Sequence, residues 1–244
     1  MKKLIFSIFC FFVLSNQAIA LVEVDITRGN LDPLPIAVSP LYIEPGSSEI
    51  TEDGKTIRDV GEEISKVIEV NFKRSGLFNP LKKESFVQKP DIAHAKPRFE
   101  DWRLIKAQAL VTGKVKITKD KLRAEFRLWD VVAAKEMVAL AFSTTPENWR
   151  RVAHIISDKI YERLTGEEGY FDSRIIYVSE TGKKTQRFKK LAIMDQDGAN
   201  VKYLTLGNEL VLTPRFSPKN QRIKKLAIMD QDGANTKYLT LGNE

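Results

Sequence analysis

The stretch NWRRVAHIISDKIYERLTGEEGYFDSRIIYVSE, residues 148–180, joins two regions of different pattern. Its first half predicts an amphipathic helix that ends at Gly166. The apolar residues of one helical face are Val152, Ile156, Ile160 and Leu164. Residues 174–180 instead predict a β-strand, and no helical period follows to residue 244. The chain therefore divides into an α/β region before this junction and an all-β region after it.

The upstream region predicts a compact α/β domain over residues 35–168. Its strands are expected at residues 35–43, 107–117, 122–130 and 135–142. A first helix is expected over residues 56–75, with Gly76 as its left-handed cap. Residues 90–97 are expected to form a polar loop. The second helix is expected to begin at Thr145, whose hydroxyl would cap it ahead of a proline in the first turn.

The first twenty residues have the build of a secretory signal peptide. Two lysines precede an apolar run over residues 4–14, and small residues follow it. The alternative is a transmembrane anchor, but the run is too short to cross the hydrocarbon of a membrane. We expect export and cleavage between Ala20 and Leu21. Lipid attachment at Cys10 is not expected, since the residues before it are too large.

Residues 21–34 predict an extended N-terminal segment, because polar and apolar side chains alternate there with period two. The two alternating sets are Val22, Val24 and Ile26 against Glu23, Asp25 and Thr27. Gly29 and Pro33 interrupt the pattern. The segment is either an edge strand of the domain or a detached tail that can add to the sheet of another protein.

The composition is that of a globular protein whose core stabilises it. The chain holds 39 basic and 32 acidic residues, and removal of residues 1–20 leaves 37 basic residues and a formal charge of +5. These charges lie in short mixed clusters, so a nucleic-acid partner is not expected. The only cysteine is Cys10, so the mature protein has no internal disulfide.

The phrase KKLAIMDQDGAN occurs twice, at residues 189–200 and 224–235. Aligning residues 186–209 with residues 221–244 gives 22 identities in 24 positions. Solvated positions tolerate many residues, so identity this high is more than a shared fold requires. It indicates a recent duplication of the DNA or an error in reading it. Residues 169–244 are therefore interpreted as an all-β region that contains an internal duplication, residues 186–209 and 221–244.

A few residues of the chain resemble parts of metal-binding motifs. Asp195 to Asn200 resembles a calcium loop, but its glycine is fourth instead of sixth and Leu206 stands where a bidentate glutamate belongs. A hairpin turn at Asp197-Gly198 is the favoured interpretation. His94 and His154 are far apart in the chain and are not expected to bind metal. No catalytic residue, cofactor or small-molecule substrate is predicted.

Several segments together resemble the TolB family of periplasmic proteins of the Tol-Pal system. They are PIAVSPLYIEPG, DVGEEISKVIEVNFKRSGLFNPL, ALVTGKV, the junction stretch above and LTPRFSPKNQRI, in the order of the family. The resemblance implies an N-terminal α/β domain followed by a six-bladed β-propeller. The 74 residues from Phe171 to Glu244 are too few for such a ring, so the propeller is expected to be incomplete here.

The resemblance also implies a non-enzymatic adaptor of the periplasm. Members bind the peptidoglycan-associated lipoprotein Pal through the propeller and offer their N-terminal segment to the inner-membrane protein TolA. By position, the TolA-binding residues here are Val22, Glu23, Val24, Asp25, Ile26, Thr27 and Arg28. Since the propeller is expected to be incomplete, Pal binding is expected to be impaired.

Other functions stay open at the level of sequence. A truncated remnant without function is the first alternative, since the second copy of the repeat falls where the family continues with new sequence. An exported hydrolase with a propeller ahead of its catalytic domain is a second, although no nucleophile motif is present. A substrate-binding protein that uses the α/β domain alone is a third.

Overall fold

The computed structural model describes residues 32–52, 55–183 and 186–206, with short segments at 214–216, 225–228 and 237–240. The predicted signal peptide, its cleavage site at Ala20 and Leu21, and residues 22–28 lie outside the described residues. Within the described parts of the chain, no helix is long and apolar enough to cross a membrane.

A mixed six-stranded sheet forms the centre of the first half of the chain. Its main strands are β5 (Phe78–Pro80), β1 (Leu34–Val38), β6 (Ala109–Ile117), β7 (Leu122–Asp130) and β8 (Lys135–Thr144), in that spatial order. β1 runs parallel to both β5 and β6, whereas β6, β7 and β8 form an antiparallel meander. The short strand β2 (Tyr42–Ile43) extends the pairing along β6. The expected strand over residues 35–43 is thus two strands, separated at Pro40, which has no backbone N–H to donate.

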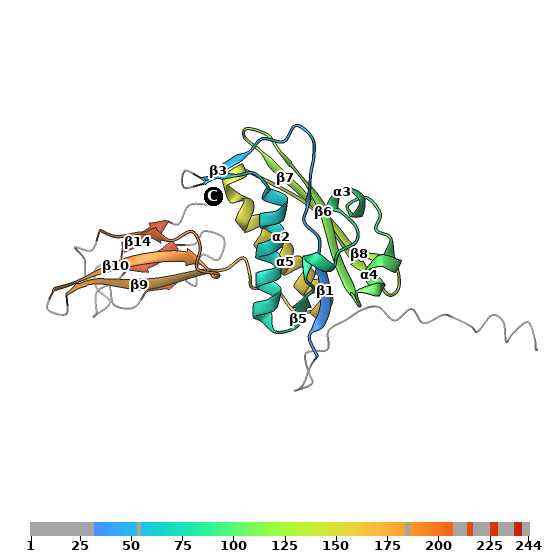
Figure 1. The fold of residues 1–244 in the computed structure, drawn as a ribbon. Helices are drawn as coiled ribbons and strands as arrows, with labels where there is room; N and C mark the ends of the chain where they lie inside the picture. The colour runs from blue at the N-terminus through green and yellow to red at the C-terminus, as the bar shows by residue number, and fades with distance from the viewer. Residues whose placement is uncertain are drawn as a thin grey trace, which may run out of the picture.

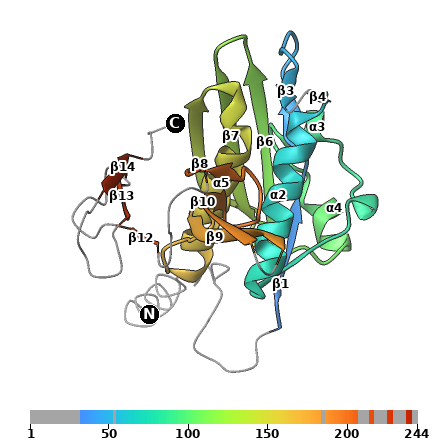
Figure 2. The same ribbon diagram turned by 90° about the vertical axis from the view of Figure 1, so that its left-hand side faces the viewer.

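Two long helices, α2 (Val60–Ser75) and α5 (Trp149–Thr165), cover one face of this sheet. They lie side by side in Figures 1 and 2. Each buries its apolar stripe against the alternate residues of the strands that face it. The largest fully buried members of this core include Ile36, Ile64, Ile68, Phe72, Phe126 and Leu128.

The opposite face is covered by two short helices, α3 (Pro90–Ala93) and α4 (Phe99–Leu104). The polar loop expected at residues 90–97 was therefore partly wrong. α4 packs Phe99 and Trp102 into a second, smaller core with Trp129 of β7. A helix this short shows too few apolar repeats for its periodicity to be recognised in the sequence.

The ends of the long helices are set by their caps. Gly76 and Gly166 both adopt left-handed backbone conformations, with φ of 73° and 75°, so both predicted C-terminal caps are confirmed. The start predicted for α2 was wrong: residues 55–57 form β4 (Lys55–Ile57), a hairpin partner of β3 (Ile50–Glu52). The Asp59 carboxylate accepts the N–H of Glu62 and caps the helix at 2.8 Å.

The predicted hydroxyl cap of the second helix was also wrong. Thr145 precedes a single 3₁₀ turn, Pro146–Asn148, and its side chain makes no capping bond to the backbone. The proline still occupies the first helical turn, as its fixed φ favours.

Three antiparallel strands follow the junction stretch: β9 (Arg174–Lys183), β10 (Gln186–Asp195) and β11 (Lys202–Tyr203). β9 and β10 are longer than the sequence predicted, since their pairing continues to Lys183 and Gln186. They extend away from α2 and α5 in Figure 1 and point toward the viewer in Figure 2. We refer to these three strands as the first blade.

A second three-stranded sheet repeats the arrangement of the first blade. It consists of β12 (Arg215–Phe216), β13 (Lys225–Ile228) and β14 (Lys237–Thr240). In the first blade Ala192 pairs with Tyr203, and in the second sheet Ala227 pairs with Tyr238, the positions 35 residues later. The two copies of the repeated phrase thus pair their strands in the same register.

Candidate functional site: the contact between the first blade and the α/β domain

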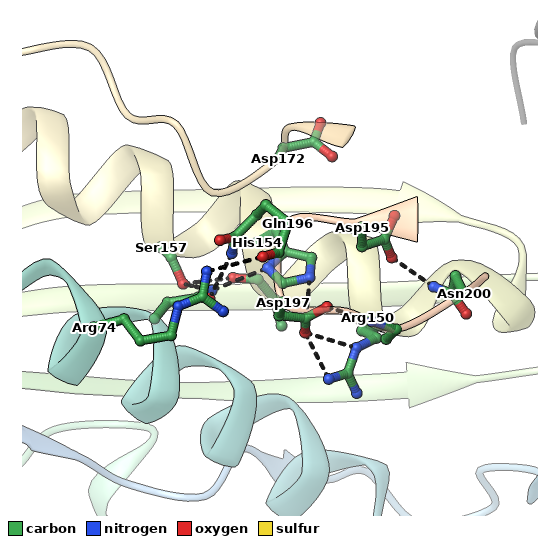
Figure 3. A network of polar contacts seen from close by, with 12 residues as sticks. Arg74, Arg150, His154, Ser157, Asp172, Asp195, Gln196, Asp197 and Asn200 are labelled. Atoms are coloured by element: carbon green, nitrogen blue, oxygen red, sulfur yellow. Dashed lines mark hydrogen bonds and ion pairs between the residues drawn. The ribbon is translucent and has the colours of Figure 1, made fainter. Parts of the chain in front are cut away.

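The turn between β10 and β11 carries the polar residues of the repeated phrase. Gly198 has φ of 88°, its N–H donates to the Asp195 carbonyl at 2.9 Å, and the N–H of Asp195 donates to the Ala199 carbonyl at 2.9 Å. This geometry confirms the predicted turn at Asp197-Gly198, because glycine reaches positive φ without steric cost. We refer to residues 195–200 as the docking turn, since it lies against α2 and α5 (Figure 3).

Arg150 of α5 forms the closest ion pair of this contact. Its Nε and Nη2 atoms donate to Asp197 Oδ2 at 3.0 and 2.6 Å. The Asp197 side chain is only 4% exposed, and its other oxygen accepts the N–H of Ala199 at 3.0 Å. Charge-assisted bonds of this length are the stronger kind of hydrogen bond. The Asp197 carboxylate therefore links the docking turn to α5.

A second set of bonds links the docking turn to α2. Gln196 Nε2 donates to Asn71 Oδ1 at 3.0 Å, and Arg74 donates to the Gln196 carbonyl at 3.1 Å. The Asn71 amide nitrogen lies 3.0 Å from both Ser157 Oγ and His154 Nδ1 on α5. The buried amide of Asn71, on α2, thus contacts both α5 and the blade.

The direction of these bonds assigns the proton of His154. Ser157 donates its hydroxyl hydrogen to the Ala153 carbonyl at 2.8 Å, so its oxygen accepts from Asn71. The second hydrogen of the Asn71 amide then points at His154 Nδ1, which must accept it. The neutral imidazole accordingly carries its proton on Nε2, 3.5 Å from Asp197 Oδ2. Nε2 is buried and has no hydrogen-bond partner among the described residues.

Burial and neighbouring charges act in opposite directions on the pKa values of Asp197 and His154. Burial would raise the pKa of the Asp197 carboxyl, but the Ala199 N–H and the Arg150 guanidinium outweigh burial and lower it. Burial lowers the pKa of the His154 imidazole, although the Asp197 and Asp195 carboxylates act in the other direction. The favoured state is an ionised Asp197 beside a neutral His154.

The segment that connects α5 to β9 is also held by hydrogen bonds and close packing. Both carboxylate oxygens of Asp158 accept backbone N–H groups, from Phe171 at 2.6 Å and from Asp172 at 3.0 Å. A Cβ at Gly169 would lie 2.4 Å from the Asp158 Cα, so only glycine permits this approach. Phe171 is fully buried beside Phe72 of α2. The first blade is therefore attached to the α/β domain through a packed connector.

The same residues include a set that could be taken for a metal centre. His154, Asp195 and Asp197 each offer a ligand atom within 4.8 Å of the others. Two observations argue against a cation there. The tautomer assigned above places a proton on the imidazole nitrogen that faces the carboxylates, and the Arg150 guanidinium already donates to Asp197 Oδ2. The donor set as arranged does not fit a divalent ion.

The part that three residues play in this contact was not predicted from the sequence. Asp197 was interpreted only as a turn residue, and His154 only as a histidine without a metal, but both lie in the docking contact. Asn71 lies in α2, and the only sequence feature that marks it is that it is a polar residue beside the apolar stripe of the helix. His94 stacks on Tyr42, with 4.6 Å between ring centroids, away from this site. The residues predicted to bind TolA, 22–28, lie outside the described residues.

Two family models match the chain. One, described as the TolB amino-terminal domain, matches residues 22–137, and the other, described as the TolB beta propeller domain, matches residues 161–224. The chain is 69% identical over 208 residues to the Tol-Pal system protein TolB of Pelagibacter ubique (strain HTCC1062). That alignment covers 85% of this chain and 47% of the relative, so the chain spans about half the length of the relative.

A solved structure agrees with these matches. The crystal structure of TolB from Acinetobacter baumannii superimposes with a TM-score of 0.63 at 20% identity, over 90% of this chain and 53% of that one. At this identity the likeness concerns the fold. The expected fold class, an α/β domain followed by the first strands of a β-propeller, is confirmed. By sequence and by fold, this chain belongs to the TolB family.

Proposed function

We propose that this chain is a periplasmic adaptor of the Tol-Pal system that acts by binding other proteins and catalyses no reaction. The 69% identity to the Tol-Pal system protein TolB of P. ubique carries this proposal. In this role the protein would connect inner-membrane Tol proteins to Pal, and so support envelope integrity and invagination of the outer membrane during division.

The N-terminal segment is proposed to bind a TolA-type partner by strand addition. Backbone hydrogen bonds would supply the affinity in this mode, and alternate side chains would supply the selectivity. In residues 22–28 the apolar members of the alternating pattern are Val22, Val24 and Ile26. The segment precedes β1 in the sequence, and the first residue of β1 is Leu34.

Pal is proposed to bind through the propeller strands. The strands of the first blade are antiparallel and well paired, and they present exposed apolar and aromatic side chains, among them Phe188 and Tyr203. Aromatic residues are enriched at protein interfaces. The proposal for Pal therefore concerns the part of the chain after the junction, and the proposal for TolA concerns its first residues.

A direct binding experiment tests both parts. The full exported chain is titrated with the periplasmic domains of TolA and Pal by calorimetry. The double variant Val24→Asp with Ile26→Asp is expected to weaken TolA binding at least about tenfold and to leave Pal binding unchanged, because a buried charge without a partner is costly. The matched control is Glu23→Ala with Thr27→Ala, on the other side of the same extended segment.

The outcomes separate the two contacts. Equal loss of TolA binding in both double variants would contradict strand addition with an apolar side. Absence of binding to TolA and to Pal by the unaltered chain would overturn the adaptor proposal and favour a remnant without function.

A further inference from the structure

We propose that His154 makes the docking of the first blade sensitive to pH: the contact accepts only the neutral imidazole with its proton on Nε2, and acidification of the surroundings releases the docking turn from α2 and α5. The site is the buried set of Asn71, His154, Ser157, Gln196 and Asp197. This behaviour is independent of which proteins the chain binds.

The reason lies in the Asn71 amide. Both of its hydrogens are used, one on Ser157 Oγ and one on His154 Nδ1. A second proton on the imidazole must go to Nδ1, where it would face the N–H of Asn71 at a separation of 3.0 Å between the two nitrogens. Two N–H donors cannot form a hydrogen bond with each other. Turning the amide over by itself would set its nitrogen against Gln196 Nε2, which donates to its oxygen in the docked state.

The other charges around His154 do not remove this conflict. Asp195 and Asp197 on the blade and Asp172 on the connector attract a proton to the ring, whereas Arg150 on α5 repels one. Arg74 on α2 reaches the same turn through the Gln196 carbonyl. Asp197 is held by Arg150 at 2.6 Å and lies 3.5 Å from Nε2, so its charge is already largely compensated. His154 is 98% buried, and a buried cation with an unmet donor is unfavourable.

The direction of the pH effect follows from linkage. Once the blade undocks, water reaches His154 and its pKa rises toward that of a free imidazole, about 6.5. In the docked state its pKa is lower, mainly because of burial. The undocked state therefore binds more protons as the pH falls below about 6.5, and docking weakens. If the docked imidazole stays neutral throughout, the fraction of open molecules rises about tenfold between pH 7.5 and pH 5.5.

Hydrogen exchange of the full chain measures this fraction. The amides of the docking turn are followed by mass spectrometry at pH 7.5 and 5.5, with correction for the intrinsic exchange rates. Protection is expected to fall by up to about tenfold in the unaltered chain. It is expected to change less than twofold in His154→Gln, which keeps a polar side chain at this position but does not titrate. His94→Gln is the matched control and should keep the full pH response.

A second measurement requires no substitution. The imidazole ¹⁵N shifts of His154 report the tautomer and the titration directly. Protonation on Nε2 with no titration down to about pH 6 supports the proposal. An Nδ1–H tautomer, or titration at or above 6.5, overturns it, as does the same pH response in the His154→Gln variant. An increase in protection on addition of Zn²⁺ would also overturn it, because it would assign these residues to a metal.

Discussion

The α/β domain and the first blade are stabilised in different ways. In the α/β domain, one large apolar cluster lies between the sheet and the helices α2 and α5, and a second lies under α4. In the first blade, the apolar cluster is small and centres on Leu191, whereas Phe188 and Tyr203 are 50% and 58% exposed. The blade is instead attached by charged and amide side chains around the docking turn.

This difference implies that the stability of the fold and the orientation of the blade depend on different contacts. Burial of apolar surface is the dominant favourable term in folding and has little directional preference. Hydrogen bonds between buried polar groups contribute less in net energy, but they require one geometry. We expect the α/β domain to fold through its core, and the blade to take its orientation from the contacts of Asn71, Arg150 and His154.

The largest effect is expected from truncating the core of the α/β domain. Phe72 is fully buried beside Phe78 and Phe171, so Phe72→Ala should lower the free energy of unfolding by about 3–5 kcal/mol. Phe188→Ala removes the same side chain from the half-exposed surface of the blade and should change it by less than about 0.5 kcal/mol. Urea denaturation measures both. Similar losses would show that the blade has a core of its own.

A smaller effect is expected from the ion pair of the docking turn. Asp197→Asn removes the charge that holds Arg150 and should weaken docking by about 1.5–3 kcal/mol, as for other bonds to charged groups. The matched control is Asp232→Asn, the same position in the second copy of the repeat. Amide exchange of residues 195–200 reports the change. If the two variants act equally, the first copy has no special role in docking.

The connector should respond more weakly still. Asp158→Asn keeps one acceptor oxygen for the two backbone N–H groups of Phe171 and Asp172, and should cost about 1–2 kcal/mol. The expected consequence is faster cleavage of the connector by a protease, while the helices resist as before. Glu168→Gln, in the same connector, serves as the control. Unchanged cleavage in Asp158→Asn would mean that the aromatic packing of Phe171 alone holds the connector.

The smallest effect is expected at an exposed ion pair of α5. Lys159 and Glu162 lie 2.7 Å apart, but both side chains are almost half exposed. Pairs of this kind contribute little because water and salt screen them. Lys159→Ala should leave both the stability of the α/β domain and the docking of the blade unchanged within error. A clear loss of docking would place α5 surface charges in the contact.

Much of the fold was predictable because it follows from local pattern. The strands β6, β7 and β8 were predicted as a meander, and Gly76 and Gly166 marked the ends of both long helices. The short helices α3 and α4 were missed, since four to six residues carry too little periodicity. The start of α2 was placed too early because Ile57 continues the helical spacing into a strand.

The docking site was not predictable from local pattern. Asn71 and Gln196 are 125 residues apart, and nothing in either neighbourhood indicates their contact. The turn at Asp197-Gly198 was predicted from its residue types. The partner of the Asp197 side chain was not predicted, because this partner, Arg150, belongs to another element.

A double-mutant cycle between Arg150 and Asp197 tests the docking most directly. The variants Arg150→Ala and Asp197→Ala and their combination are compared by the exchange of the Gln196 and Gly198 amides, which do not bond to either side chain. If the ion pair holds the blade on the α/β domain, the two substitutions should couple by about 1–3 kcal/mol and the double variant should lose little beyond either single one. Additive losses, with a coupling near zero, would contradict the docking of the first blade through this turn.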